Sequence, residues 1–237
     1  VLKKHLDSGT AYSLVFTVNF FPWIAEVCSI YGIMYFSLIV DSPNLYDQYS
    51  SGYRFSRSYY REIKKHLAGK KLFAQNFDIR HCNRSYFQTA VESFRKEFAH
   101  TAVFLFSEQL TIVGSAEPGS LILSAESYSR LKKFSASQPQ LFFSELQCIS
   151  HVIAPDAAVL AQGNAVPESR ADSILSPRRT GNILPDSLAS SYETSHTAGL
   201  ALVSPSDPVF KSAVEQGLRA YEKQFTLLKQ IEKNEMS

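Results

Sequence analysis

The stretch that most limits the fold is the apolar run at residues 18–46, "VNFFPWIAEVCSIYGIMYFSLIVDSPNLY". A transmembrane helix needs about 20 uninterrupted apolar residues. Here Glu26 would lie near the centre of the bilayer, where an ionisable group is costly. Pro22 and Gly32 also interrupt the run. We therefore predict no membrane span and assign the stretch to a protein core.

The same stretch has the pattern of a β-α-β unit. Residues 14–18, "LVFTV", form a short apolar run that is typical of a buried strand. Pro22 suits the first turn of a helix, and Gly32 suits its C-terminal cap. Residues 33–40, "IMYFSLIV", predict a second buried strand. The crossover between the two strands should be right-handed and the strands parallel.

This arrangement places Asn19 and Asp41 just past the carboxyl ends of the two predicted strands. Open α/β sheets bind ligands along that edge. Asn and Asp are also common turn and capping residues, which is the alternative interpretation of each residue alone. The two together favour a site.

The stretch, with "YRFSRSYYREIKKHLAGKKLF" at 53–73, resembles the N-terminal half of CgeB-like bacterial glycosyltransferases of the GT-B class, over roughly residues 8–80. In that family a strand ending in Asn-Phe leads to a helix, a Gly-Ile, a second strand and an Asp-Ser-Pro. The resemblance implies a Rossmann-like half domain over 1–83. It also implies an enzyme that transfers sugar from a nucleotide sugar to a glycan or other hydroxyl acceptor, without a further cofactor.

The resemblance makes Asp41 the candidate catalytic residue, with Asn19 and Ser42 as candidate substrate-binding residues. Asp41 would act as a general base on the acceptor hydroxyl or only hydrogen-bond to it. The chain departs from the family at Ser56, where the family has Asp, and at "LFAQNFDI", where a Leu-Pro-Leu strand end is expected. It shows no second half with an acidic residue and a Gly-rich turn. We therefore expect little stabilisation by UDP or GDP, and a non-catalytic binding or assembly protein remains the alternative.

Residues 54–71 predict a basic helix that ends at Gly69. Most such helices present a solvated face. Arg57 and Ser58 stand at its start, where free backbone N–H groups and a nearby guanidinium favour an anion. We predict both as substrate-binding residues.

Residues 84–163 predict an α+β region, because helices and short strands no longer alternate regularly. The expected elements are helices at 85–100 and, after a Ser124 cap, 125–134, with strands at 101–106, 110–114, 120–123, 140–153 and 157–163. This order, with "VIAPDAAVLAQG" at 152–163, resembles the cone-shaped SnoaL or ketosteroid-isomerase-like fold. The resemblance implies a small-ligand pocket in 84–163 as a further alternative.

A Ser/Pro-rich linker is predicted at 164–206, since this stretch has four prolines and no clear period. A long amphipathic helix follows at 207–237, with Asp207 as N-cap and Pro208 in the first turn. Its single apolar stripe indicates packing on the domain, a partner chain or an oligomer.

The charge and the cysteines exclude several classes of protein. A net charge of +2 and a pI of about 8.4 are too low for a dedicated nucleic-acid binder. The three cysteines are widely spaced and form no cluster with histidines, so we predict no metal site and reduced thiols in a cytoplasmic protein. The expected fold class is therefore α/β: a Rossmann-like parallel βαβ half, an α+β region and a long C-terminal helix.

Overall fold

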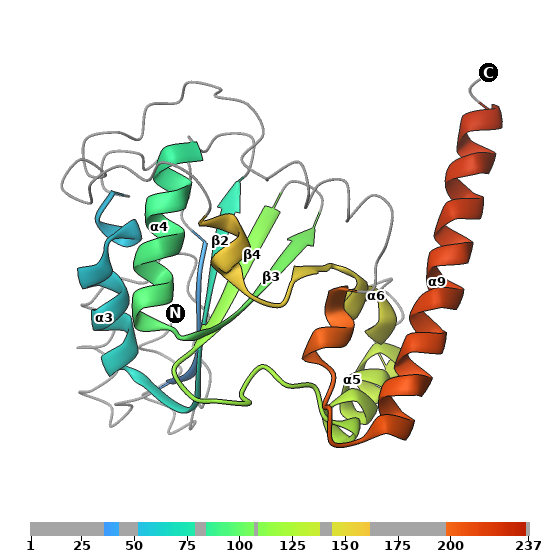
Figure 1. Ribbon diagram of the computed structural model, residues 1–237, viewed down its shortest axis with the longest axis horizontal. Coiled ribbons are helices and arrows are strands. Elements are labelled where there is room, and N and C mark those ends of the chain that lie inside the picture. The colour runs from blue at the N-terminus through green and yellow to red at the C-terminus, as the bar shows by residue number, and fades with distance from the viewer. Residues whose placement is uncertain are drawn as a thin grey trace, which may run out of the picture.

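The computed structural model describes residues 36–42, 52–78, 84–106, 109–137, 144–161 and 198–235. Within them the protein is a mixed α/β structure built on a five-stranded sheet of order β1-β2-β4-β3-β5 (Figure 1). Strands β1 and β2 pair in parallel, and the other pairs are antiparallel. The strands are β1 (Phe36–Asp41), β2 (Leu67–Asp78), β3 (His100–Phe106), β4 (Gln109–Ser115) and β5 (Val152–Ala154).

One face of the sheet is covered by helices α3 (Arg57–Lys65) and α4 (Arg84–Glu97), which lie side by side in Figure 1. The 3-10 helix η2 (Gly52–Phe55) precedes α3 in the connection from β1 to β2. A second 3-10 helix, η4 (Ala157–Leu160), packs on α4. The connection between the two parallel strands therefore returns over the same face as α4.

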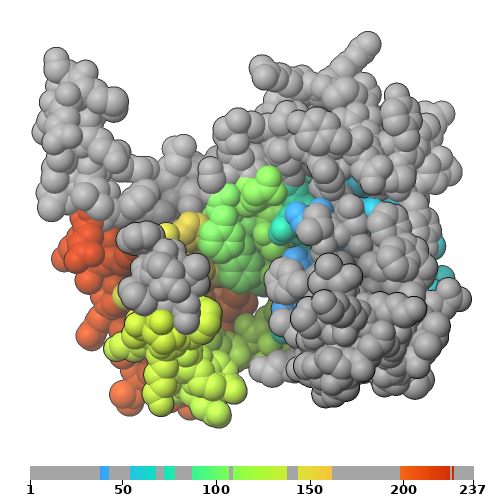
Figure 2. Space-filling view, turned by 180° about the vertical axis from the view of Figure 1, so that it is seen from behind, coloured from blue at the N-terminus to red at the C-terminus, as the bar shows by residue number. Residues whose placement is uncertain are grey.

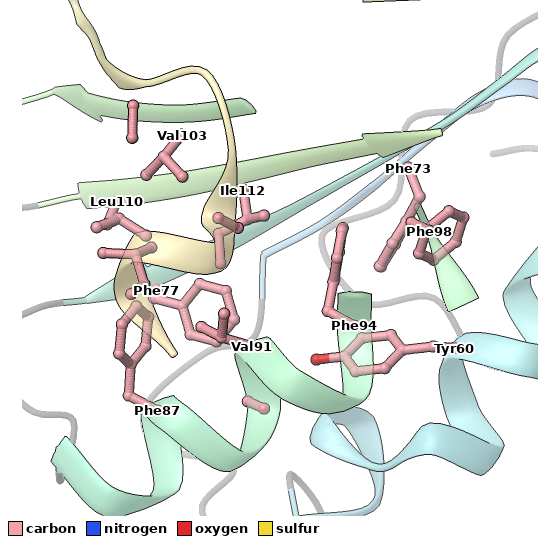
Figure 3. Close-up of a cluster of buried hydrophobic side chains, with 14 of the residues drawn as sticks. Tyr60, Phe73, Phe77, Phe87, Val91, Phe94, Phe98, Val103, Leu110 and Ile112 are labelled. Atoms are coloured by element: carbon pink, nitrogen blue, oxygen red, sulfur yellow. The ribbon is translucent and has the colours of Figure 1, made fainter. Parts of the chain in front are cut away.

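The first core lies between this helical layer and the sheet and is rich in phenylalanine (Figure 3). Phe94 of α4 stacks on Phe73 of β2 with ring centroids 5.6 Å apart, and its ring lies 4.9 Å from that of Phe98. Gly114 of β4 faces this stack, and a Cβ there would overlap the Phe94 ring. Glycine is thus the residue that lets α4 approach the sheet closely.

A second core joins the elements on the right of Figure 1. These elements are α5 (Ala125–Ser137), α6 (Glu145–Ser150), the 3-10 helix η5 (Ala198–Leu202) and α9 (Pro208–Glu235). Its buried members are Ile149, Val203, Val214 and Leu218. An isolated parallel bridge pairs Leu123 with Val203. A Cβ at Gly217 would lie 3.0 Å from Leu146, so α9 and α6 are in close contact.

Several local predictions are confirmed. The strand predicted up to residue 40 is β1, and Asp41 is its last residue rather than the first residue past it. The helix predicted from residue 85 is α4. Ser124 caps α5 by accepting a hydrogen bond from the Ser127 N–H at 3.1 Å, and Asp207 caps α9 by accepting one from the Phe210 N–H at 2.9 Å. Each cap depends on a few neighbouring residues, so it can be predicted from the sequence alone.

The predicted end of the basic helix is wrong. Helix α3 ends at Lys65, and Gly69 lies inside β2. His66 is the C-cap, and its N–H donates to the carbonyl of Ile63 at 3.0 Å. The long strand β2 therefore begins where the sequence pattern still favoured helix. Its first residue, Leu67, pairs with Phe36 of β1, and this pairing outweighs the helical pattern at that position.

Three predicted strands are also corrected. Residues 120–123 form a turn with a single bridge, and residues 145–150 form α6. Among the described residues of the strand predicted at 140–153, Val152 and Ile153 are extended in the sheet, as part of β5 (Val152–Ala154). Residues 157–160 form η4. Ser144 and Asp156 explain the two helical corrections, since their side chains accept the Gln147 and Ala158 N–H groups at 3.1 and 2.8 Å.

Other predictions fall outside the described residues. These are the strand at 14–18, the helix from Pro22, Asn19, and the linker from 164 to 197. The last part of that predicted linker, 198–206, is described and contains η5. No helix in the described parts of the chain combines the length and apolar character needed to cross a membrane.

Candidate functional site

The candidate site is a buried polar cluster at the carboxyl end of β1. Asp41 is the last residue of that strand and is paired in register with Gln75 of β2. Arg54 comes from η2, and Tyr59 comes from the first turn of α3. Ser56 fixes the start of α3, since its Oγ accepts a hydrogen bond from the Tyr59 N–H at 3.3 Å. The parallel connection thus brings all these residues together.

The carboxylate of Asp41 is the centre of the cluster. Its Oδ2 accepts hydrogen bonds from the Tyr59 hydroxyl at 2.9 Å and from Gln75 Nε2 at 3.1 Å. Its Oδ1 lies 3.9 Å from Nη1 of Arg54. Gln75 extends the network, because its Oε1 accepts from the Tyr60 hydroxyl at 2.6 Å. We call Asp41, Arg54, Tyr59, Tyr60 and Gln75 the Asp41 cluster.

The whole Asp41 cluster is buried, with Asp41 at 0% and Arg54 at 3% exposure. Charged groups at such depth are tolerated when they are paired and hydrogen-bonded. Gln75 Nε2 also donates to the Arg54 carbonyl at 3.2 Å, which ties the backbone of η2 to β2. The cluster therefore fixes the position of η2 and α3 on the edge formed by β1 and β2.

The buried environment of the Asp41 cluster shifts the pKa of Tyr59. Burial raises the pKa of its phenol above the ordinary value, and the charge of Asp41 raises the pKa further, while Arg54 acts in the opposite sense. The phenol therefore remains a hydrogen-bond donor to the carboxylate. Its contribution to stability is present below pH of about 10, the ordinary tyrosine pKa, and declines at higher pH because the unfolded phenol then ionises.

The predicted anion-binding residues lie at the start of α3 and are exposed. Arg57 Nε donates to Glu97 Oε1 of α4 at 2.7 Å, and Arg61 Nη2 lies 3.6 Å from the same oxygen. The Ser58 and Ser56 hydroxyls are 2.8 Å apart and share a hydrogen bond. Arg57 thus ties α3 to α4.

The structure brings Asp41 together with residues that the sequence analysis did not assign to a site. Tyr59, Tyr60 and Gln75 were missed, and so was Arg54, which the sequence placed in a basic helix with a solvated face. One signal was present: Gln75 stands between Phe73 and Phe77 at the two-residue spacing of a strand. Both phenylalanines enter the first core, so a glutamine on the same face had to meet a buried polar partner.

Ser42 follows β1 directly and is half-buried, whereas Asp41 is fully buried, and Pro43 lies outside the described residues. Among the described residues, no group of three or more histidine, cysteine or acidic side chains is arranged to hold a metal ion. Comparison with protein-family models, with curated proteins and with solved structures finds no match to this chain.

Proposed function

We propose that this chain is a glycosyltransferase-like protein that binds a hydroxyl-bearing glycan acceptor at the carboxyl end of β1. The observation that supports the proposal is the fixed parallel edge of β1 and β2, with Asp41 at its end. Ligands of open α/β sheets bind at such an edge. The proposal also includes a nucleotide sugar as the donor. It further includes a Rossmann-like half domain that contributes Asn19 to the site.

The geometry favours a positioning role for Asp41. A general base must come within about 2.6–3.2 Å of the group that it deprotonates. Asp41 is fully buried and its Oδ2 already accepts two hydrogen bonds. Ser42 is the next residue and is half-buried, so in our proposal its hydroxyl contacts the acceptor. Asp41 then holds the end of β1 in place.

The first test measures sugar transfer. Purified protein is incubated with UDP- and GDP-sugars and with maltoheptaose or chitotetraose, and release of UDP or GDP is followed. We expect Ser42→Ala to lower kcat/KM about tenfold with an unchanged melting temperature, since one lost hydrogen bond is worth about 1 kcal/mol or slightly more.

Ser137→Ala is the matched control, because Ser137 is exposed on α5 and hydrogen-bonds only within its own helix. Its activity should equal that of the unmodified chain. The proposal fails if no donor and acceptor pair gives nucleotide release, or if Ser42→Ala transfers sugar at the full rate.

A second candidate function is assembly through α9. This helix has 28 residues and is therefore about 42 Å long. The described side chains that enter the second core, Phe210, Val214 and Leu218, all lie in its first three turns. Figure 1 shows the rest of α9 continuing past the other labelled helices. A helix that extends beyond its own core is typical of partner or oligomer contacts.

Removal of residues 222–237 tests this second function. The shortened chain keeps Phe210, Val214 and Leu218, so we expect an unchanged melting temperature. If α9 mediates self-assembly, light scattering should give a multiple of 26.6 kDa for the full chain and a monomer for the shortened one. A monomeric full chain would exclude self-assembly, and sugar transfer that survives the truncation would separate this function from the first.

A further inference from the structure

A pocket of about 300 Å³ lies between the sheet and the helices of the second core, α5, α6 and η5. Phe104 of β3 and Val152 of β5 form the sheet side, and Leu131 of α5 and Cys148 of α6 form the helical side. Figure 2 shows the surface hollowed between α5, in yellow-green, and the strands, in green. Its volume is at the lower end of the range for small-molecule sites.

The pocket is on the opposite face of the sheet from the Asp41 cluster. Val103 and Leu105 of β3 enter the first core beneath α4. Side chains alternate along a strand, so Phe104 points to the other face. Asp41 contacts Tyr59 of α3, which packs on the same face as α4. The pocket is therefore separate from the edge proposed for the acceptor.

The described walls of the pocket are apolar and uncharged. None of the described lining residues is acidic or basic, and their polar side-chain groups are the hydroxyls of Ser120 and Ser127 and the thiol of Cys148. Burial raises the pKa of the Cys148 thiol, and the charge of Glu145 raises it further, so the thiol remains protonated. An ionised ligand would lose its hydration here and gain no counter-ion.

The walls are held by backbone hydrogen bonds between segments far apart in the chain. The Leu123 N–H donates to the Leu202 carbonyl at 2.7 Å, and the Ser204 N–H donates to the Leu123 carbonyl at 3.0 Å. A Cβ at Gly199 would overlap the backbone of Ile149, so η5 and α6 are packed in close contact beside the pocket. Walls that are joined by such backbone hydrogen bonds indicate a pocket that is formed before a ligand binds.

We propose that this pocket binds a neutral, mostly apolar small molecule of about two fused rings that carries one hydrogen-bonding group. An apolar cavity of about 150 Å³ holds a single benzene ring, so about 300 Å³ suits a molecule twice that size. The rings lie among Phe104, Leu131 and Val152. The polar group reaches a serine hydroxyl or the Cys148 thiol.

The test compares 2-naphthol with 2-naphthoate at pH 7, where the first is neutral and the second ionised. Ligand fluorescence is titrated with the full chain. We expect saturable binding of 2-naphthol and at least about tenfold weaker binding of 2-naphthoate, which corresponds to about 1.4 kcal/mol. Equal binding of both molecules, or no saturable binding of 2-naphthol, overturns the proposal.

A matched pair of variants locates the site. Leu131→Asp places a carboxylate in the pocket wall, whereas Phe134→Asp places one on the same helix outside the pocket. No side chain of α5 is fully buried, so both variants should fold, which circular dichroism checks. We expect Leu131→Asp to weaken 2-naphthol binding at least about tenfold and Phe134→Asp to leave it unchanged. Equal effects of the two variants place the ligand elsewhere.

Alkylation of Cys148 gives a second readout that needs no variant. Iodoacetamide modification is measured at each cysteine by peptide mass spectrometry. Saturating 2-naphthol should slow the reaction at Cys148 several-fold, because the thiol lines the occupied pocket. An unchanged rate at Cys148 under saturating ligand contradicts binding in this pocket.

Discussion

Replacing Arg54 with Met is expected to lower the free energy of unfolding by about 3–5 kcal/mol, because it removes one member of a buried ion pair and leaves the buried carboxylate of Asp41 without that guanidinium. Asp41 and Arg54 are 0% and 3% exposed, so water cannot replace the lost guanidinium. Met keeps much of the apolar stem of Arg54, which limits the effect of lost packing. Urea denaturation at pH 7 gives the measurement.

Arg57→Met is the matched control. It removes the same guanidinium from a neighbouring position, but the Arg57 side chain is 44% exposed. Its partner Glu97 is only 9% exposed, yet Arg61 Nη2 still lies 3.6 Å from the same oxygen when Arg57 is gone. We expect a loss of about 0–1 kcal/mol. The double variant Arg54→Met/Asp41→Asn removes both buried charges and should be more stable than Arg54→Met alone. Equal losses for Arg54→Met and Arg57→Met would show that the buried pair has no special contribution.

The buried ion pair also means that an Asp41→Asn variant would change stability as well as any activity. Asparagine would still meet Gln75 and Tyr59, but it would leave the Arg54 guanidinium buried without its counter-charge. We therefore expect a large loss of stability from the single variant. For this reason Ser42, rather than Asp41, is the residue on which the proposed acceptor contact is tested.

The sequence predicted those parts of the fold that local patterns specify. The end of β1, the start of α4 and the Ser124 and Asp207 caps each depend on a few neighbouring residues. It did not predict α6, because the apolar residues around 145–150 also suit a strand. The Ser144 cap decides between the two, and a single serine is a weak signal in a chain rich in serine.

Contacts between distant segments were harder still to predict. Asp41 and Gln75 meet only because β1 and β2 pair in parallel. The register of that pairing cannot be predicted from the sequence of either strand alone. The second core shows the same limit. Val203 lies in a stretch predicted as linker, and it is buried in a core with Ile149, Val214 and Leu218 of distant segments, beside its bridge to Leu123. The candidate site was therefore found at Asp41, while its partners were not.

Phe94→Ala is expected to lower the free energy of unfolding by about 3–5 kcal/mol, as for other large aromatic residues removed from a core. Phe94 is 0% exposed, and its ring contacts those of Phe73, Phe98 and Tyr60 at centroid distances of 5.6, 4.9 and 5.2 Å. Phe134→Ala is the control, since Phe134 is 50% exposed on α5. It should change stability by no more than about 0.5 kcal/mol.

Gly114 makes this prediction more specific. In the native chain Gly114→Ala should cost about 1–3 kcal/mol, because the added methyl group overlaps the Phe94 ring. In the Phe94→Ala background that ring is absent and the methyl group enters the vacated space, although it still lies 2.8 Å from the Cβ of Phe98. The Gly114→Ala substitution should therefore cost about 1 kcal/mol less there than in the native chain, measured as the interaction energy of a double-mutant cycle in urea. Additive losses would mean that Phe94 and Gly114 do not pack against each other, and that the close approach of α4 to the sheet has another cause.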